Sequence, residues 1–174
     1  MKLRLPLFAL LIAGIVGTAS SQTFKTLKAS LVAQIDVAGS KLVRLAEAES
    51  QEQYSWRPME GVRSVSEVYM HVAMGNYNFL RMAGVTPPMK MERGLEKSVT
   101  TKADVIEYLK KSFAFAKKSI EAMTEKDFAK KTKMFGQDAT CGTVIVTLAA
   151  HDHEHLGQSI AYARSNKVVP PWSM

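Results

Sequence analysis

The sequence predicts an all-α protein folded as a four-helix bundle. Four long segments place apolar residues at the three- and four-residue spacing of a helix with one buried face, and no segment shows the alternation of a convincing strand. Hydrophobic residues make up 47% of the 174 residues, and glycine and proline are few. This composition excludes a disordered or fibrous chain and suits a single domain.

The first helix is expected over about residues 24–48. Its apolar residues, among them Leu31, Ile35, Leu42 and Leu45, recur on one helical face. The polar sequence ESQEQ follows this face directly, and we expect it to end the helix.

The second helix is expected from Ser64 to about Ala83. Ser64 and Glu67 have the Ser-x-x-Glu spacing of a capping box, in which each side chain bonds the backbone N–H of the other residue. Gly84 follows the last apolar residue, as is usual at the C-terminal end of a helix.

The third helix is expected from near Thr101 to about Met123, with Asp104 completing a second capping box. A polar stretch follows, opening with TEKDF and closing near MFGQDAT, with room for one extra helical turn. The fourth helix, from about Cys141 to Ser165, is the most apolar, and the prolines in NKVVPPWS prevent its continuation. Because the linkers are long, the order of the helices in space does not follow from this pattern.

Residues 1–21 are expected to be a signal peptide, which leaves residues 22–174 as the bundle domain. A short basic segment precedes an apolar run, and Ala19 and Ser21 are small residues placed for cleavage. The apolar run is too short for a comfortable membrane span, and an uncleaved N-terminal anchor is the alternative. We therefore expect an exported bacterial protein, periplasmic or secreted, with no membrane attachment after cleavage.

The charge and the cysteine count exclude further classes. The formal charge of +7 falls to +5 when Lys2 and Arg4 are removed with the signal peptide. The remaining basic residues are mixed with acids and lack interleaved aromatic residues, so nucleic acid is not an expected partner. Cys141 is the one cysteine and cannot form an internal disulfide, and we expect it to be packing rather than a reactive thiol. The oligomeric state is left open.

Three of the four histidines lie in the sequence HDHEH, residues 151–155. His151 and His155 are four residues apart and project from the same face of a helix, whereas His153 is rotated to the other side. His71 comes from the second helix, and taken alone it would be interpreted as a satisfied core or boundary histidine. A pair of imidazoles at this spacing, joined by a third from a facing helix, indicates a three-histidine metal site.

Two other metal motifs fit less well. The His-Glu-x-x-His pattern of zinc proteases fails because Gly157 stands where its second histidine would be, and a di-iron centre would need two Glu-x-x-His motifs. We therefore expect one divalent ion, with zinc as the first choice and nickel as the second. Asp152, Glu154 and Gln158 are candidates to orient the imidazoles, and solvated surface positions are the alternative for each.

These features together resemble the DinB/YfiT-like family. The resemblance rests on SWRP and SVSEVYMH, which leads up to His71, on the His-x-x-x-His-x-Gly-Gln pattern of the fourth helix, and on PPW near the C-terminus. It covers about residues 24–174 and implies a four-helix bundle with an up-down-down-up order. It also implies one divalent metal held by His71, His151 and His155, with no ligand role for His153.

The resemblance further implies a metal-dependent enzyme, since relatives include thiol S-transferases, a mycothiol-dependent isomerase and members described as hydrolases. This chain departs from the family at Leu156, where an arginine is often found. We expect a hydrolase that uses metal-activated water, because export separates the chain from the thiol cofactors of the cytoplasm. The alternatives are a metal-dependent thiol S-transferase, a non-enzymatic metal-binding or interaction module, and a bundle without metal.

The base and the substrate are left open by the sequence. Glu67, Asp152 and Glu154 are candidates for a base, and the substrate is expected to be a small molecule of unknown identity. Four aromatic residues are candidates to line its pocket: Trp56, Tyr69, Tyr77 and Tyr162.

Overall fold

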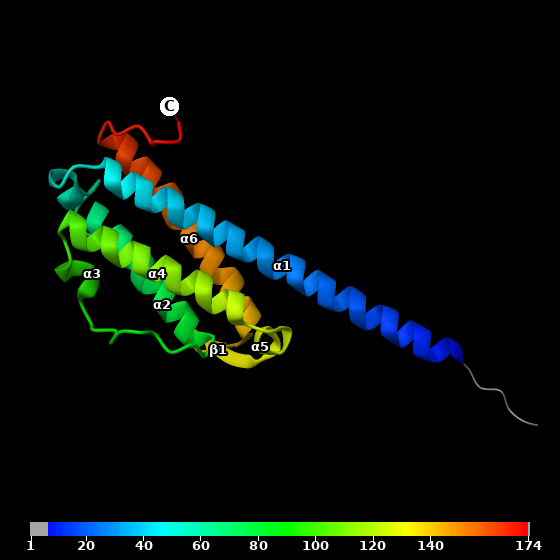
Figure 1. Cartoon of the computed structure of the whole chain (residues 1–174). Coiled ribbons are helices and arrows are strands. Elements are labelled where there is room, and N and C mark those ends of the chain that lie inside the picture. The colour runs from blue at the N-terminus through cyan, green and yellow to red at the C-terminus, as the bar shows by residue number, and fades with distance from the viewer. Residues whose placement is uncertain (1–6, 174) are drawn as a thin grey trace, which may run out of the picture.

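The computed structural model describes the backbone of residues 7–173 and the side chains of residues 21–173. The predicted four-helix bundle is confirmed (Figure 1). Its long helices are α1 (Leu7–Ala48), α2 (Val65–Met82), α4 (Lys102–Ala122) and α6 (Cys141–Ser165). The shorter elements are η1 (Glu52–Ser55), α3 (Leu95–Ser98), α5 (Glu125–Ala129), β1 (Lys131–Met134) and β2 (Gln137–Thr140).

α1 and α2 each pack against both α4 and α6. α1 and α4 are antiparallel, since Lys28 near the start of the described side chains donates to the carbonyl of Met123, just after α4, at 2.9 Å. At the other end, Lys102 donates to the carbonyl of Glu49, just after α1, at 2.6 Å. This pairing of opposite ends fixes the direction of α4 relative to α1.

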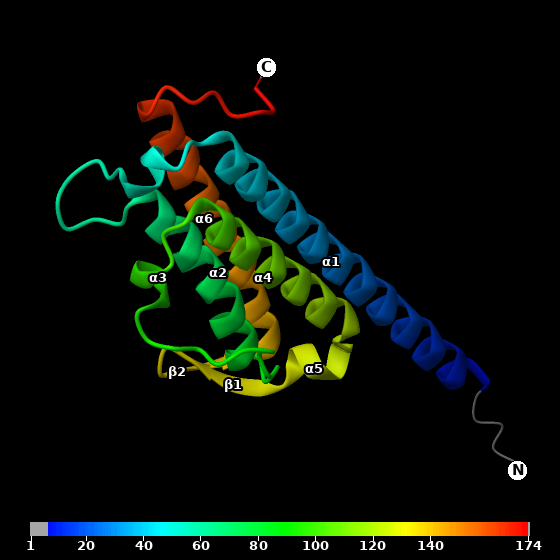
Figure 2. The ribbon, with the colours of Figure 1, turned by 60° about the vertical axis from the view of Figure 1, so that its left-hand side comes forward.

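α2 and α6 are also antiparallel. The Sγ atom of Cys141 at the start of α6 lies 3.4 Å from the carbonyl oxygen of Ala83, just after α2. α6 runs parallel to α1, because His153 contacts the carbonyl of Gln34 and the segment after α6 accepts a hydrogen bond from Arg44. In chain order the long helices therefore run up, down, down and up (Figure 2).

Local sequence signals set the ends of these helices. Ser64 and Glu67 form the complete capping box at the start of α2, as predicted. At the start of α4, the hydroxyl of Thr101 accepts the backbone N–H of Asp104, which is one half of such a box. α6 begins at Cys141, the predicted position.

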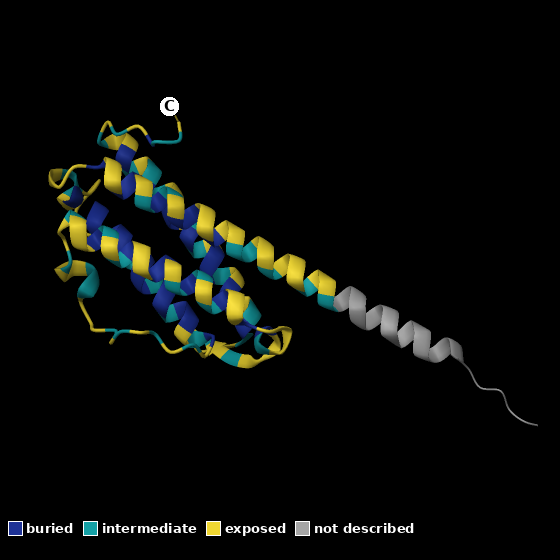
Figure 3. Ribbon diagram, in the orientation of Figure 1, coloured by how far each residue is buried: buried dark blue, intermediate teal, exposed yellow. Residues whose placement is uncertain are grey.

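The buried faces of the long helices meet along the centre of the bundle (Figure 3). Leu42, Leu109 and Ile145 are among the large side chains that are fully buried there. Cys141 belongs to the same core, and burial raises the pKa of its thiol. The expectation that this cysteine is packing agrees with its position.

The prediction that the chain contains no strand was wrong. β1 and β2 form an antiparallel hairpin in which Lys131 pairs with Thr140 and Met134 pairs with Gln137. Each strand has only four, mostly polar residues, so no apolar alternation marks them in the sequence. The extra helical turn expected in this region is present as α5.

Of the predicted signal peptide, residues 1–21, residues 1–6 lie outside the described residues, and only the backbone is described for residues 7–20. From Leu7 the backbone is already helical, so α1 begins earlier than the predicted residue 24. After Pro6 no proline interrupts this segment, and the helix continues without a break into the bundle. In the part of the chain that the structure describes, no helix is both long and apolar enough to cross a membrane.

Candidate metal centre

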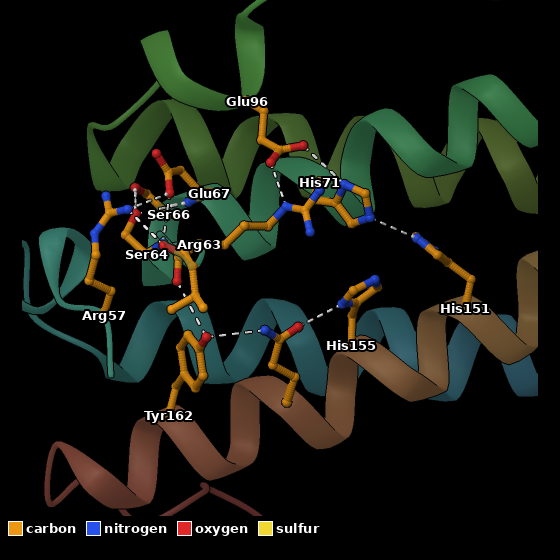
Figure 4. Close-up of polar contacts among 12 residues, drawn as sticks. Arg57, Arg63, Ser64, Ser66, Glu67, His71, Glu96, His151, His155 and Tyr162 are labelled. Atoms are coloured by element: carbon orange, nitrogen blue, oxygen red, sulfur yellow. Dashed lines mark hydrogen bonds and ion pairs between the residues drawn. The ribbon is translucent and has the colours of Figure 1, made fainter. Parts of the chain in front are cut away.

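Three histidines from two helices converge on one point (Figure 4). α2 supplies His71, and α6 supplies His151 and His155 from successive turns. The candidate ligand atoms of the three residues all lie within 4.8 Å of one another. The Nε2 atoms of His71 and His151 are 3.2 Å apart. The antiparallel packing of α2 on α6 thus brings the predicted cluster together.

The other ring nitrogen of His71 is held by a carboxylate. Its Nδ1 atom lies 3.0 Å from Oε2 of Glu96, a residue of the short helix α3. The second oxygen of Glu96 accepts a hydrogen bond of 2.5 Å from Nε of Arg63. Burial opposes ionisation of Glu96, but the bonds from Arg63 and His71 outweigh it and hold the pKa of Glu96 below its ordinary value. Glu96 is therefore an ionised acceptor that fixes His71 with the lone pair of its Nε2 atom directed at the other two histidines.

His155 is held in a comparable way from within its own helix. Its Nδ1 atom lies 2.8 Å from Oε1 of Gln158, one turn later in α6. The amide nitrogen of Gln158 donates to the hydroxyl of Tyr162 at 3.2 Å, and that hydroxyl donates to the backbone carbonyl of Arg63 at 3.3 Å. This chain of bonds orients the imidazole and leaves its Nε2 lone pair free.

His151 is positioned by packing instead of by a hydrogen bond to Nδ1. Its ring lies against the bare backbone of Gly75 and makes an edge-to-face contact with Phe79, with ring centroids 5.2 Å apart. The Nδ1 atom is buried and has no hydrogen-bond partner within residues 21–173. The nearest carboxylate oxygen, Oδ1 of Asp152, is 3.9 Å away. Asp152 itself is fully buried, and burial raises its pKa to about 6.

The donor set fits a divalent ion that prefers imidazole. Burial lowers the pKa of both His71 and His155, and the nearby charge of Arg63 lowers both further, so the rings are neutral at neutral pH. Neutral rings are what metal binding requires. Two nitrogens bound to one tetrahedral zinc at ordinary bond lengths lie about 3.3 Å apart. The observed 3.2 Å between His71 and His151 is close to that separation.

Of the remaining residues that the sequence analysis named, one contacts a ligand candidate and the others are engaged elsewhere or exposed. Gln158 orients a ligand candidate, as the sequence suggested, and His153 points away, with its Nε2 atom 3.2 Å from the carbonyl of Gln34. Glu67 is engaged in the capping box and in an ion pair with Arg57 at 3.3 Å, and Glu154 is exposed.

The four aromatic candidates are also separated by the structure. Tyr69 and Tyr77 are buried in the core. Tyr162 belongs to the hydrogen-bond network of His155, and Trp56 packs edge-to-face on its ring at 5.3 Å. Of the four candidates, Tyr162 and Trp56 are therefore the two that are connected to the histidine cluster.

Glu96 and Arg63 escaped the sequence analysis. Glu96 lies in a four-residue helix within a long linker, where no periodicity marks its orientation. Arg63 immediately precedes the cap of α2, a position that has no pattern of its own. The direct pairing of Arg63 with Glu96, 33 residues apart, leaves no local signal in the sequence.

A comparison with protein families matches residues 34–159 to the DinB superfamily. No curated protein matches the chain. Among solved structures, a DinB-like protein from Bacillus cereus ATCC 10987 has a TM-score of 0.69 at 17% identity, covering 77% of this chain and 89% of that one. The DinB-like protein YjoA from Bacillus subtilis has a TM-score of 0.66 at 20% identity, covering 80% and 93%.

A third similar structure carries a functional description. YfiT from Bacillus subtilis has a TM-score of 0.65 at 14% identity, covering 82% of this chain and 89% of its own. It is described as a probable metal-dependent hydrolase with an unusual four-helix bundle topology. At these identities the likeness shows the fold, and the family assignment rests on the match over residues 34–159. The chain belongs to the DinB superfamily and is a DinB/YfiT-like protein.

Proposed function

We propose that the chain is an exported, metal-dependent hydrolase that acts on a small molecule. The observation that supports this proposal is the convergence of His71, His151 and His155, with Nδ1 of two of them fixed by Glu96 and Gln158. The three Nε2 atoms would hold one divalent ion. Zinc is our first choice for this ion and nickel our second, because both accept imidazole readily.

Three protein ligands leave coordination positions for water or substrate. A bound ion of this kind acts as a Lewis acid and lowers the pKa of water, which makes a nucleophile available near neutral pH. The chain itself contributes neutral imidazoles, a carboxylate that fixes the tautomer of His71, and a largely buried setting that strengthens electrostatic contacts.

Space for a small substrate lies beside the site. Glu96 also lines a cleft of about 590 Å³, together with Met74, Asn78 and Leu95. A volume of this size is ordinary for a small-molecule pocket. None of the three histidines lines this cleft, which adjoins the site through Glu96. Its volume is compatible with a small-molecule substrate, and nucleic acid is not proposed as a partner.

The first test is metal analysis of residues 22–174, purified without a histidine tag or chelator. We expect about one equivalent of zinc or nickel in the wild type, and loss of the metal in His71→Ala and His151→Ala. His153→Ala is the matched control, since it removes a neighbouring histidine outside the cluster and should leave the metal content unchanged. Absence of metal from the wild type after reconstitution would overturn the proposal.

The second test separates the function classes. The metal-loaded protein is assayed against esters, amides and phosphate esters, and separately with low-molecular-weight thiols. Hydrolysis that is lost in His151→Ala while the variant stays folded supports the hydrolase. Efficient thiol transfer without hydrolysis would favour an S-transferase, and unfolding of His151→Ala would indicate a structural metal site. Fusion of residues 1–21 to a reporter that works only in the periplasm tests export.

A further inference from the structure

Arg63 is tied at both of its ends to the histidine cluster. Its side chain reaches His71 through Glu96, and its backbone carbonyl reaches His155 through Tyr162 and Gln158. The guanidinium group is therefore held in a fixed place, although the side chain is 41% exposed. Figure 4 shows this group beside the ring of His71.

Only part of the hydrogen-bonding capacity of Arg63 is used. A guanidinium group has five N–H donors in a plane, and the Nε donor bonds Glu96. The two terminal amino groups of Arg63 have no hydrogen-bond partner in the part of the chain that the structure describes. Four donors thus remain beside the site, on a guanidinium group that is joined to His71 through Glu96.

The charges around the cluster also favour an anion. The carboxylate of Glu96 is balanced by the guanidinium of Arg63, with Nε of Arg63 2.5 Å from Oε1 of Glu96. Imidazole ligands bind a metal ion as neutral rings, so they would leave the charge of a divalent ion uncompensated. The buried carboxyl group of Asp152, whose Oδ1 lies 3.9 Å from Nδ1 of His151, would offset at most one of the two charges. A planar guanidinium with two free amino groups matches the geometry of a carboxylate or phosphonate, which it can bind through two parallel hydrogen bonds.

We propose that the terminal amino groups of Arg63 form an anion subsite beside the three histidines, which binds a carboxylate or phosphoryl group of the substrate. This inference rests on the proposed function in one respect: the bound anion is part of a substrate only if the chain is an enzyme. The subsite itself is defined by anion binding. Arg63 then selects small substrates that carry a negative charge within reach of the histidine cluster.

Methylphosphonate is the probe, and its binding to residues 22–174 is measured by calorimetry in zinc-loaded and metal-free protein. In the zinc-loaded form we expect Arg63→Met to weaken binding about tenfold or more while zinc content stays at the wild-type level. Arg63→Lys should recover part of the affinity, since lysine restores the charge without the planar fork. Methylphosphonate should bind the metal-free wild type weakly, and Arg63→Met should abolish that residual binding.

Arg57→Met is the matched control. Arg57 lies in the same loop at 39% exposure, but it pairs with Glu67 and not with the cluster, so its loss should leave methylphosphonate affinity unchanged. Equal affinity in Arg63→Met and the wild type would overturn the subsite. Loss of zinc in Arg63→Met would also overturn it, because Arg63 would then act by holding Glu96 on His71.

The two proposals fail separately. Binding of methylphosphonate that depends on Arg63, in a protein that hydrolyses nothing, would sustain the subsite and remove the hydrolase. Hydrolysis by a protein whose affinity for methylphosphonate is the same with and without Arg63 would sustain the hydrolase and remove the subsite.

Discussion

The ring of His151 packs directly against the backbone of Gly75. A Cβ atom added at Gly75 would lie 2.6 Å from Cε1 of that ring, closer than side chains tolerate. His151 has no hydrogen bond at Nδ1 to hold it in place, so its position depends on this contact and on Phe79. The glycine is needed here for close approach, and no left-handed backbone is involved.

We therefore predict that Gly75→Ala pushes the His151 ring out of the cluster and lowers zinc affinity about tenfold or more. Zinc affinity is measured by competition with a chromogenic chelator. Gly157→Ala is the matched control, because a Cβ atom at that helical position meets nothing within 4 Å. It should keep wild-type zinc affinity. Unchanged affinity in Gly75→Ala would show that His151 is not required in its present position.

At this scale the sequence predicted the residues that depend on helical periodicity. His151, His155 and Gln158 lie on one face at spacings of four and three, and their orientation follows once the helix is placed. Glu96 and Arg63 could not be found in this way. Their positions depend on how two long linkers fold back over α2, which is determined by tertiary packing and not by a local pattern.

At the scale of elements, the hairpin β1–β2 is the part that the sequence did not reveal. Its turn places Phe135 and Gly136 at φ of 50° and 84°. Two successive positive φ values are typical of the tight turn of a two-residue hairpin, where Asn-Gly is the usual signal. Phe135 is an unusual residue for the first position, and it is 70% exposed with its ring 5.9 Å from that of Phe79. Because phenylalanine stands at the first turn position instead of asparagine, the sequence lacks the usual signal of a hairpin turn.

Gly136→Ala should destabilise the protein by about 1 kcal/mol, because a Cβ atom is disfavoured in the left-handed region. Thermal unfolding measures the change. The same substitution at Gly157, which has an ordinary helical backbone in α6, should instead stabilise by up to about 1 kcal/mol. We expect zinc content to remain at the wild-type level in Gly136→Ala, and its loss would show that the hairpin supports the cluster.

The helices were predicted more closely than the hairpin because their boundaries carry chemical signals. The capping box of Ser64 and Glu67, the proline pair after α6 and the apolar stripes each indicate an end or a face. α1 is the exception. Its start at Leu7 lies in the segment that is expected to be a signal peptide, so its apolar residues were not assigned to the first helix of the bundle.

At the scale of the whole molecule, the up-down-down-up order could not be derived from the spacing of residues. Long linkers allow several orders, and only the resemblance to a family favoured this one. The observed order has a direct consequence for the site. It makes α2 and α6 antiparallel neighbours, which places His71 opposite the pair on α6.

A buried carboxyl group outside the histidine cluster belongs to the interior of the bundle. Glu49 follows α1 and is 1% exposed, with one oxygen accepting a 2.5 Å hydrogen bond from the hydroxyl of Tyr69. Its other oxygen is buried without a hydrogen-bond partner among the described residues. Burial raises the pKa of Glu49 from 4.5 to about 7, although the Tyr69 bond and the charge of Lys102 act to lower it.

A carboxyl group with a higher pKa in the folded protein than in the unfolded chain binds more protons in the folded state. Stability therefore falls as pH rises from about 4.5 to about 7, and the pH window is that of Glu49 itself. The shift corresponds to at most about 3 kcal/mol, which is lost once Glu49 ionises. Glu49→Gln resembles the neutral acid and can still accept the Tyr69 hydroxyl, so this loss should disappear.

We predict that Glu49→Gln and the wild type have similar free energies of unfolding at pH 4.5, and that the variant is the more stable by up to about 3 kcal/mol at pH 8. Urea denaturation of metal-free protein across this range measures the difference without interference from metal binding. Glu47→Gln, at an exposed position paired with Lys110, is the control and should keep the wild-type profile. Parallel pH profiles for Glu49→Gln and the wild type would mean that Glu49 is ionised in the folded bundle, with its charge compensated by Lys102 and Tyr69.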